Sequence, residues 1–117
     1  EENIVKLYKK EKNGVMIVTA TQRLDGATSP ELEKYLTDIA SETSSNVILD
    51  LGDLEYISSA GLRVVLATAK NLKTQKRELF ISGLTGPVSD VFQLSGFSAI
   101  LKIFDTNAQA LEHCKNN

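Results

Sequence analysis

VILDLGDLEYISSAGLR, residues 47 to 63, joins a short apolar run to two adjacent serines and to the start of a helical pattern. Val47–Leu51 is nearly all apolar, which is typical of a strand covered on both faces. After Gly61, apolar residues recur at helical spacing: Leu62, Val65, Leu66, Ala69 and Leu72. The stretch therefore predicts a buried strand, a connecting turn, and a helix over 60–74 with the serines at its amino end.

The two serines, Ser58 and Ser59, occupy a position that suits a phosphate. In an open α/β sheet the functional edge usually lies near the carboxyl ends of the strands. The first amides of a helix lack intrahelical acceptors, and the helix dipole favours an anion there. A phosphate on either serine would therefore lie near hydrogen-bond donors. The alternative is that one serine only caps the helix, because serine is among the preferred N-cap residues.

Upstream of this stretch, the sequence predicts a hairpin and a first helix. Ile4–Glu11 and Val15–Ala20 have strand-like sequences, and Asn13-Gly14 between them is a strong hairpin signal. Thr28 and Glu31 then have the spacing of a capping box, with a proline suited to the first helical turn between them. The helical apolar stripe that follows comprises Leu32, Tyr35, Leu36, Ile39 and Ala40.

Downstream, strands and helices continue to alternate. The predicted elements are a buried strand over Glu78–Ser82, a short helix over Val88–Leu94 that ends at Gly96, a strand over Leu101–Phe104 and a helix over Ala108–Cys114. Strand followed by helix three times over implies a mostly parallel sheet with right-handed crossovers. We therefore predict one α/β domain over residues 1–117, with about four helices and the opening hairpin as an antiparallel edge. In this fold 47–51 and 78–82 pair in one sheet, and the buried centre includes Val47, Leu49, Leu62, Leu66, Leu79 and Ile81.

Composition narrows the classes of function. A length of 117 residues suits one domain with its own core, and a net charge of −2 gives no reason to expect nucleic-acid binding. The longest apolar runs, Val15–Val18 and Val64–Ala67, are too short for membrane insertion. No signal peptide is visible, and the single cysteine, Cys114, cannot form an intrachain disulfide. We expect a cytoplasmic protein that is a monomer when free.

Other polar residues each have two interpretations. Asp25 lies in a turn near the functional edge, where it either contacts a partner or forms an Asx turn. Arg63 either contacts a partner or phosphate, or is an ordinary exposed residue. A basic stretch forms either a solvated helix face or a docking surface for acidic groups: Lys70, Lys73, Lys76 and Arg77. His113 and Cys114 are consecutive, so on a helix they point about 100° apart, and we expect no metal or catalytic role.

Two other classes of protein have to be considered, a phosphate-accepting response-regulator receiver and a serine hydrolase. A response-regulator receiver would use Asp50 or Asp53 as its phosphate acceptor, but it needs an acidic pair after the first strand. The sequence has Gln22-Arg23-Leu24 near that point, and Ser82-Gly83 stands where a receiver wants a lysine. A serine hydrolase needs a histidine beside its nucleophile, whereas His113 lies near the carboxyl end of the sequence. We therefore expect no enzymatic activity.

Three motifs resemble the STAS domain, the family named for sulphate transporters and anti-sigma factor antagonists. Asp50-Leu51 with Leu54–Arg63 looks like the family signature, and Leu24–Leu32 is similar to its motif before the first helix. Val91–Phe97, followed by Ile103–Asp105, resembles its closing helix and strand. The matches occur in order and span nearly the whole chain. With no second domain or transporter span visible, a stand-alone antagonist is the nearest comparison.

The resemblance implies a partner-switching mechanism. Such antagonists bind an anti-sigma factor that is a serine kinase, are released when it phosphorylates them, and are restored by a serine phosphatase. Aligned through Gly61, the phosphoacceptor falls on Ser59, while Ser58 stands where many relatives have an acid and is the alternative acceptor. Asp25, Ala60 and Arg63 complete the expected contact surface together with these residues. No cofactor is implied, because ATP and Mg²⁺ belong to the kinase. A STAS regulator with a partner outside the sigma-factor system is the other alternative.

Overall fold

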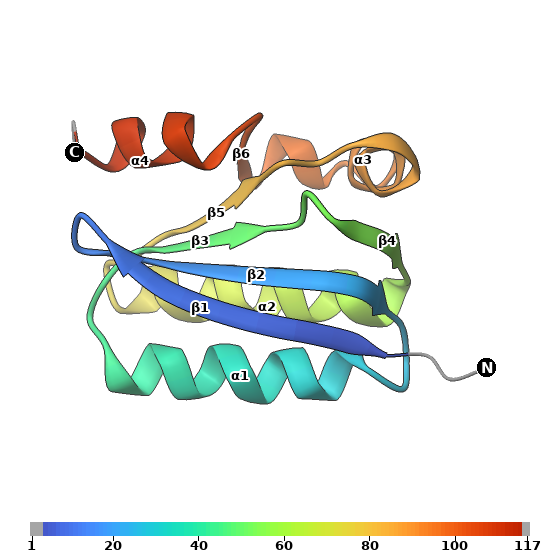
Figure 1. Cartoon of the computed structure of the whole chain (residues 1–117), viewed down its shortest axis with the longest axis horizontal. Helices are drawn as coiled ribbons and strands as arrows, with labels where there is room; N and C mark the ends of the chain where they lie inside the picture. The colour runs from blue at the N-terminus through green and yellow to red at the C-terminus, as the bar shows by residue number, and fades with distance from the viewer. Residues whose placement is uncertain (1–3, 116–117) are drawn as a thin grey trace.

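The computed structural model describes residues 4–115 and has, within them, one mixed sheet with helices on both of its faces (Figure 1). The strands are β1 (Val5–Lys12), β2 (Val15–Leu24), β3 (Val47–Asp50), β4 (Leu54–Ile57), β5 (Leu79–Ser82) and β6 (Lys102–Phe104). The α-helices are α1 (Ser29–Glu42), α2 (Ser59–Thr74), α3 (Gly86–Leu94) and α4 (Asn107–Lys115), with a 3₁₀ turn over Phe97–Ala99. The predicted α/β class and the four helices are confirmed.

The opening hairpin forms as predicted. β1 and β2 pair antiparallel from Val5 opposite Gln22 to Lys12 opposite Val15. The turn between them holds Asn13 at φ 54° and Gly14 at φ 77°, the left-handed region that Asn and Gly tolerate best. β2 is longer than predicted because its second half, beyond Ala20, also pairs with β4.

The remaining strands are parallel, in the order β1-β2-β3-β5-β6. β3 pairs with β5 in register from Val47 opposite Leu79 to Asp50 opposite Ser82, so the predicted pairing of 47–51 with 78–82 is confirmed. β4 lies off this path and pairs with the end of β2, where the register shifts between Gln22 and Arg23. The prediction of a connecting turn before the serines is therefore wrong for residues 54–57, which form a strand.

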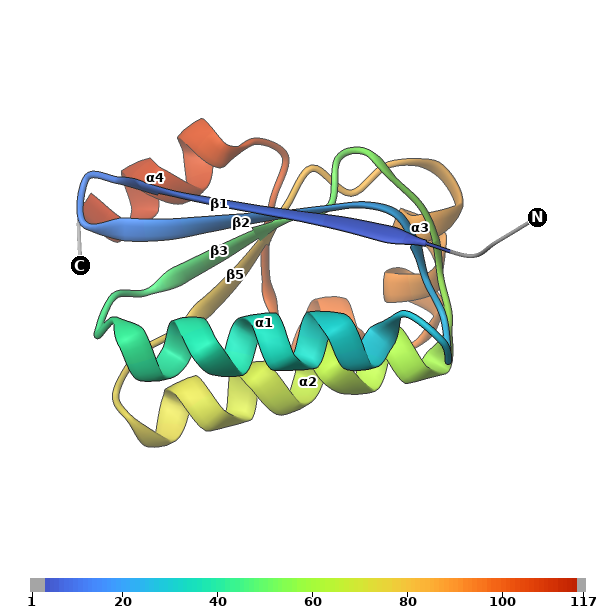
Figure 2. The same cartoon turned by 60° about the horizontal axis from the view of Figure 1, so that its bottom comes forward.

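Alternation along the strands distributes apolar side chains to two cores. α1 and α2 lie side by side under one face (Figure 2), and α4 covers part of the other face. Val47 and Leu49 join the larger core, whereas Ile48 lies in a smaller cluster with Phe80 and Ala110 of α4. This two-sided burial is why the β3 segment is apolar throughout. Of the six residues predicted at the buried centre, five are buried: Val47, Leu49, Leu62, Leu79 and Ile81.

Leu66 is the exception among those six. It is only partly buried and lines a surface groove between α1 and α2. The helical stripe predicted the correct face of α2, but Leu66 lies at the margin of that face. Helix periodicity identifies which side of a helix is apolar, whereas the width of the contact depends on how the neighbouring helix is placed.

Candidate functional site

The two serines have different roles at the start of α2. Ser58 is the N-cap residue, and its Oγ accepts a hydrogen bond from the Gly61 amide at 3.4 Å. Its own amide donates to the Leu24 carbonyl at 2.8 Å, which ties the end of β4 to the end of β2. Ser59 is the first residue of α2 and is exposed, and its hydroxyl has no hydrogen-bond partner among residues 4–115. The capping interpretation therefore applies to Ser58, and it leaves Ser59 accessible.

Gly61 lets α2 begin directly against the sheet. It is buried, and a Cβ atom there would lie 2.8 Å from Ile57 Cγ1 and 3.1 Å from Leu24 Cβ. Both distances are shorter than ordinary carbon contacts, so a larger residue would push the helix start away from β2 and β4. Gly61 and Ser58 thus set the depth and orientation at which Ser59 is presented.

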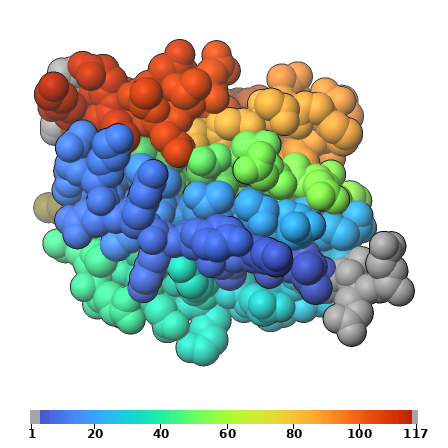
Figure 3. Space-filling model, in the orientation of Figure 1, coloured from blue at the N-terminus to red at the C-terminus, as the bar shows by residue number. Residues whose placement is uncertain are grey.

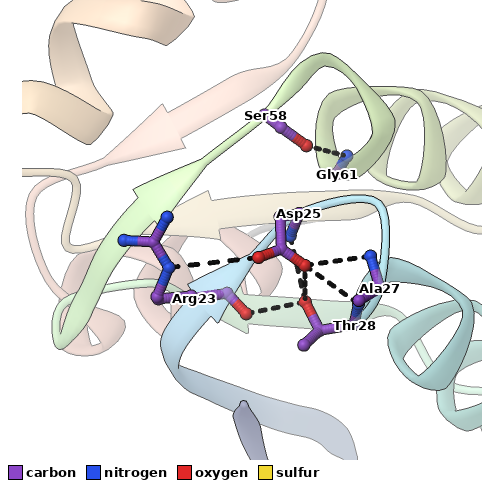
Figure 4. A network of polar contacts seen from close by, with 6 residues as sticks. All are labelled: Arg23, Asp25, Ala27, Thr28, Ser58 and Gly61. Carbon is purple, nitrogen blue, oxygen red and sulfur yellow. Dashed lines mark hydrogen bonds and ion pairs between the residues drawn. The ribbon is translucent and has the colours of Figure 1, made fainter. Parts of the chain in front are cut away.

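Asp25 organises the turn between β2 and α1, beside the serines (Figure 4). Its Oδ1 accepts hydrogen bonds from the amides of Ala27 at 3.0 Å and Thr28 at 3.1 Å. The Asx-turn interpretation of Asp25 is therefore confirmed. Whether Asp25 also contacts a partner stays a prediction.

The predicted capping box at Thr28 and Glu31 does not form. The Thr28 hydroxyl donates to the Arg23 carbonyl at 2.8 Å and accepts from the Asp25 amide at 2.9 Å, and it makes no side-chain cap on α1. Thr28 is only 1% exposed, so its hydroxyl closes the turn rather than the helix end. Competition from this tertiary turn overrides the local capping signal.

Arg23 belongs to the same cluster, although the sequence interpretation gave it no role there. Its guanidinium lies 4.3 Å from the centre of the Tyr56 ring, and its Nε lies 3.9 Å from Asp25 Oδ2. Arg23 and Tyr56 are paired across β2 and β4. The signal that could have found this contact is the strand character of 54–57, which the sequence interpretation assigned to a turn.

A groove of about 520 Å³ runs between α1 and α2 and begins next to the serines. Ala60 and Arg63 of α2 line it, and Glu33 of α1 lies in the opposite wall. Arg63 is exposed and makes no ion pair within residues 4–115. The structure therefore brings Asp25, Ser58, Ala60, Gly61 and Arg63, the predicted contact residues, to the region around the start of α2 and the β2–α1 turn.

The basic stretch at the end of α2 divides into two parts. Lys70, Lys73 and Lys76 are exposed, but Arg77 is only 6% exposed, so both interpretations of the basic stretch, a solvated face and a docking surface, are wrong for Arg77. The Arg77 guanidinium donates to three backbone carbonyls, those of Ala40 at 2.7 Å, Thr43 at 2.8 Å and Ser45 at 3.2 Å. It thereby fastens the end of α1 and the loop that follows.

Asp50, the possible acceptor of a receiver, and His113, the possible base of a hydrolase, both make contacts that hold the fold together. Asp50 accepts hydrogen bonds from the Gly52 amide at 2.9 Å and from the Asn107 side chain at 2.8 Å, which joins β3 to α4. The His113 ring packs 5.4 Å from the Phe80 ring and 5.3 Å from the Phe104 ring. Burial raises the pKa of the neighbouring Cys114 thiol, and Glu78 adds to the increase.

Within residues 4–115, no group of three or more His, Cys, Asp or Glu could hold a metal ion. None of the helices in this part of the chain has the length and apolar content needed to cross a bilayer.

Fold and site together define a small α/β domain that presents an exposed serine at the start of a helix, next to a capping serine and a close-packed glycine. The STAS domain family matches residues 6–110, and the chain therefore belongs to the STAS domain family. The resemblance of the three sequence motifs is thus confirmed.

Relatives and solved structures agree with this assignment. The chain is 37% identical over 106 residues to a Bordetella bronchiseptica protein named "Putative anti-sigma factor antagonist BtrV", and the match covers 91% of each chain. The fold resembles that of an anti-sigma factor antagonist from Mycobacterium paratuberculosis, with a TM-score of 0.84 and 22% identity over 93% of this chain and 92% of the other.

The fold also resembles that of SpoIIAA, an anti-sigma factor antagonist and Bacillus cell fate determinant solved in two forms. For the unphosphorylated form the TM-score is 0.82 at 15% identity, covering 96% of this chain and 98% of the other. For the phosphorylated form the TM-score is 0.72 at 16% identity, covering 93% and 99%.

Proposed function

We propose that this protein is an anti-sigma factor antagonist whose binding to a serine-kinase anti-sigma factor is controlled by reversible phosphorylation of Ser59. The names of the relatives support the antagonist role, and the two forms of SpoIIAA support regulation by phosphate. The protein is the substrate and not the enzyme: ATP and Mg²⁺ are bound by the kinase, and a separate serine phosphatase removes the phosphate. The protein itself uses no cofactor.

One observation carries the choice of Ser59 as the acceptor. Its hydroxyl is exposed and has no hydrogen-bond partner within the described chain, whereas the Ser58 hydroxyl accepts from the Gly61 amide. To phosphorylate Ser58, a kinase has to reach a half-buried residue whose oxygen is already held by the Gly61 amide, whereas Ser59 is exposed and its hydroxyl has no partner within residues 4–115. Alignment through Gly61 selects the same residue.

The partner surface consists of the residues around this hydroxyl. Ala60 and Arg63 lie at the start of α2 and in the adjoining groove, and Asp25 shapes the turn beside them. A phosphoserine carries roughly −1.5 to −2 charges at neutral pH. An uncompensated charge of this kind in a tight interface costs on the order of 2–5 kcal/mol, or about 30-fold to several thousand-fold in affinity. Phosphorylation therefore releases the kinase.

The sheet edges support a monomeric free form. β1 forms one edge and lies along the surface (Figure 3). It carries four lysines, Lys6, Lys9, Lys10 and Lys12, which disfavour pairing with another strand. The opposite edge, β6, has only three residues.

The test begins with a pull-down by the unmodified protein and identification of the bound kinase by mass spectrometry. That kinase is then incubated with ATP and four chains: wild type, Ser58→Ala, Ser59→Ala and Ser59→Asp. We expect wild type and Ser58→Ala to be modified at residue 59 and released. Ser59→Ala should bind but stay bound after ATP is added, because it lacks the acceptor. Ser59→Asp should bind more weakly than wild type, but less weakly than the phosphorylated protein.

Titration calorimetry measures each affinity, and thermal melts verify that each variant is folded. Modification found only on Ser58 would overturn the assignment of the acceptor. If the phosphorylated protein binds the kinase as tightly as the unmodified protein, the proposed switch is wrong.

A further inference from the structure

Arg63 lies one helical turn after Ser59 on α2, and both residues are exposed. Side chains at positions i and i+4 of a helix lie on the same face and can contact each other. The first turn of α2 contains no acidic residue, so no carboxylate on that turn competes for the guanidinium. The helix therefore places a cation beside the hydroxyl that the proposed function assigns to the kinase.

Arg63 makes no ion pair within the described residues, unlike Arg23, the other arginine at the site. Its side chain lines the groove between α1 and α2. Arg23, by contrast, stacks on the Tyr56 ring and faces Asp25 Oδ2. A phosphate on Ser59 could recruit Arg23 only at the cost of these contacts, whereas recruitment of Arg63 breaks no ion pair.

We propose that Arg63 is the phosphate-binding arginine of the phosphorylated protein: its guanidinium pairs with the phosphate on Ser59 and leaves the groove between α1 and α2. This proposal rests on the proposed function for the choice of Ser59 as the modified residue. Arginine suits the role because its planar guanidinium can donate two parallel hydrogen bonds to phosphate oxygens. Pairing with one guanidinium offsets only one of the roughly 1.5 to 2 negative charges, so a net negative charge remains to repel the partner. The partner surface also loses the guanidinium from the groove.

Four other charged residues lie near Arg63 and the start of α2, and they could also interact with a phosphate on Ser59. Glu33 of α1 lines the same groove as Arg63, while Arg23 and Asp25 lie on β2 and in the turn that follows it. Lys70 lies in the groove as well, on the same face of α2 as Ser59 but about three turns further along, or roughly 16 Å. At physiological ionic strength the screening length is about 8 Å, so Lys70 interacts only weakly with a phosphate on Ser59.

The test needs no kinase, because phosphoserine can be incorporated at position 59 during translation. The second pKa of the phosphate, about 6 in an unpaired phosphoserine, is then measured by ³¹P NMR titration. A paired cation stabilises the dianion and lowers this pKa. We expect Arg63→Gln to raise it by about 0.3 units or more relative to the otherwise unchanged phosphorylated chain, and Arg63→Lys to raise it less.

Two control variants separate Arg63 from general charge and from Arg23. Lys70→Gln removes the same charge from the same helix face and should leave the phosphate pKa nearly unchanged. Arg23→Gln should also have a small effect. Equal shifts for Arg63→Gln and Lys70→Gln, or a shift for Arg23→Gln alone, would overturn the assignment of Arg63. These results do not depend on partner binding, so a protein that binds no kinase refutes the proposed function without affecting this pair.

Discussion

At the scale of single residues, Gly61 shows how a motif position can be required by packing alone. The residue has a helical conformation, so it is not needed for a positive φ. Glycine is needed at position 61 because α2 approaches Ile57 and Leu24 closely there. The position of the serines above the sheet depends on this approach, which connects a packing constraint to the presentation of the proposed phosphoacceptor.

Gly61→Ala should destabilise the protein. The added Cβ would lie 2.8 Å from Ile57 Cγ1, and overpacking of this kind costs about 1–3 kcal/mol. Alanine recovers about 1 kcal/mol of helix propensity, so we expect a net loss of up to about 2 kcal/mol. Urea denaturation measures the change. Gly26→Ala is the matched control, because a Cβ at Gly26 meets no atom within 4 Å. If both variants are equally stable, the close approach of α2 does not constrain residue 61.

At the scale of elements, Arg77 connects two segments that the sequence alone does not bring together. The end of α1 and the loop before β3 leave carbonyls without intrahelical donors, as helix ends generally do. Arg77 comes from the segment between α2 and β5 and donates to three of these carbonyls. A buried cation that binds carbonyls is a long-range feature, so a local charge pattern could not distinguish it from the exposed lysines nearby.

Arg77→Met should therefore destabilise the protein by about 2–4 kcal/mol, because buried carbonyls lose charged donors. Arg77→Lys should have an intermediate effect, since an ammonium group cannot reproduce the planar geometry of the guanidinium. Lys73→Met removes an exposed charge from the last turn of α2 and should change stability by no more than about 0.5 kcal/mol. Denaturation midpoints of the three variants test this order, and equal losses for Arg77→Met and Lys73→Met would contradict it.

The local patterns predicted most elements correctly, and the exceptions share a cause. The hairpin, the apolar β3 and β5 segments and the helical stripes each contain their signal within one short segment. β4 does not: Leu54 and Ile57 are buried, but Glu55 and Tyr56 between them are exposed, so the segment resembles a turn. Its strand conformation depends on pairing with the extended end of β2. The capping box failed similarly, because Thr28 is used by a tertiary turn.

At the scale of the whole molecule, the α/β architecture determines where the site lies. The sequence predicted a serine pair at the carboxyl edge of a parallel sheet, and the structure places the pair there. It could not predict that Ser58 is the cap and that the Ser59 hydroxyl has no hydrogen-bond partner within residues 4–115, because cap preferences are the same for both residues. That distinction depends on the register between β4, β2 and α2, which only the assembled fold fixes.

The final prediction is that a phosphate on Ser59 leaves the fold intact. The Ser59 side chain is exposed and loses no hydrogen bond within the described chain on modification. The added charge, roughly −1.5 to −2, lies at the positive end of a helix, where its effect is neutral or favourable. We expect the melting temperature of the phosphoserine-59 protein to lie within about 2 °C of that of the unmodified protein. Backbone NMR shifts should be confined to the start of α2 and its surroundings.

Ser29 provides the matched control for this experiment. It is the first residue of α1, as Ser59 is the first residue of α2, but it is only 2% exposed. Phosphoserine at position 29 has the same charge at an equivalent helix position and has to be buried or to displace α1. Because burial of an uncompensated charge costs several kcal/mol, we expect this protein to melt at a much lower temperature. If phosphoserine at position 59 lowers the melting temperature as much as phosphoserine at position 29, the prediction that a phosphate on Ser59 leaves the fold intact is wrong.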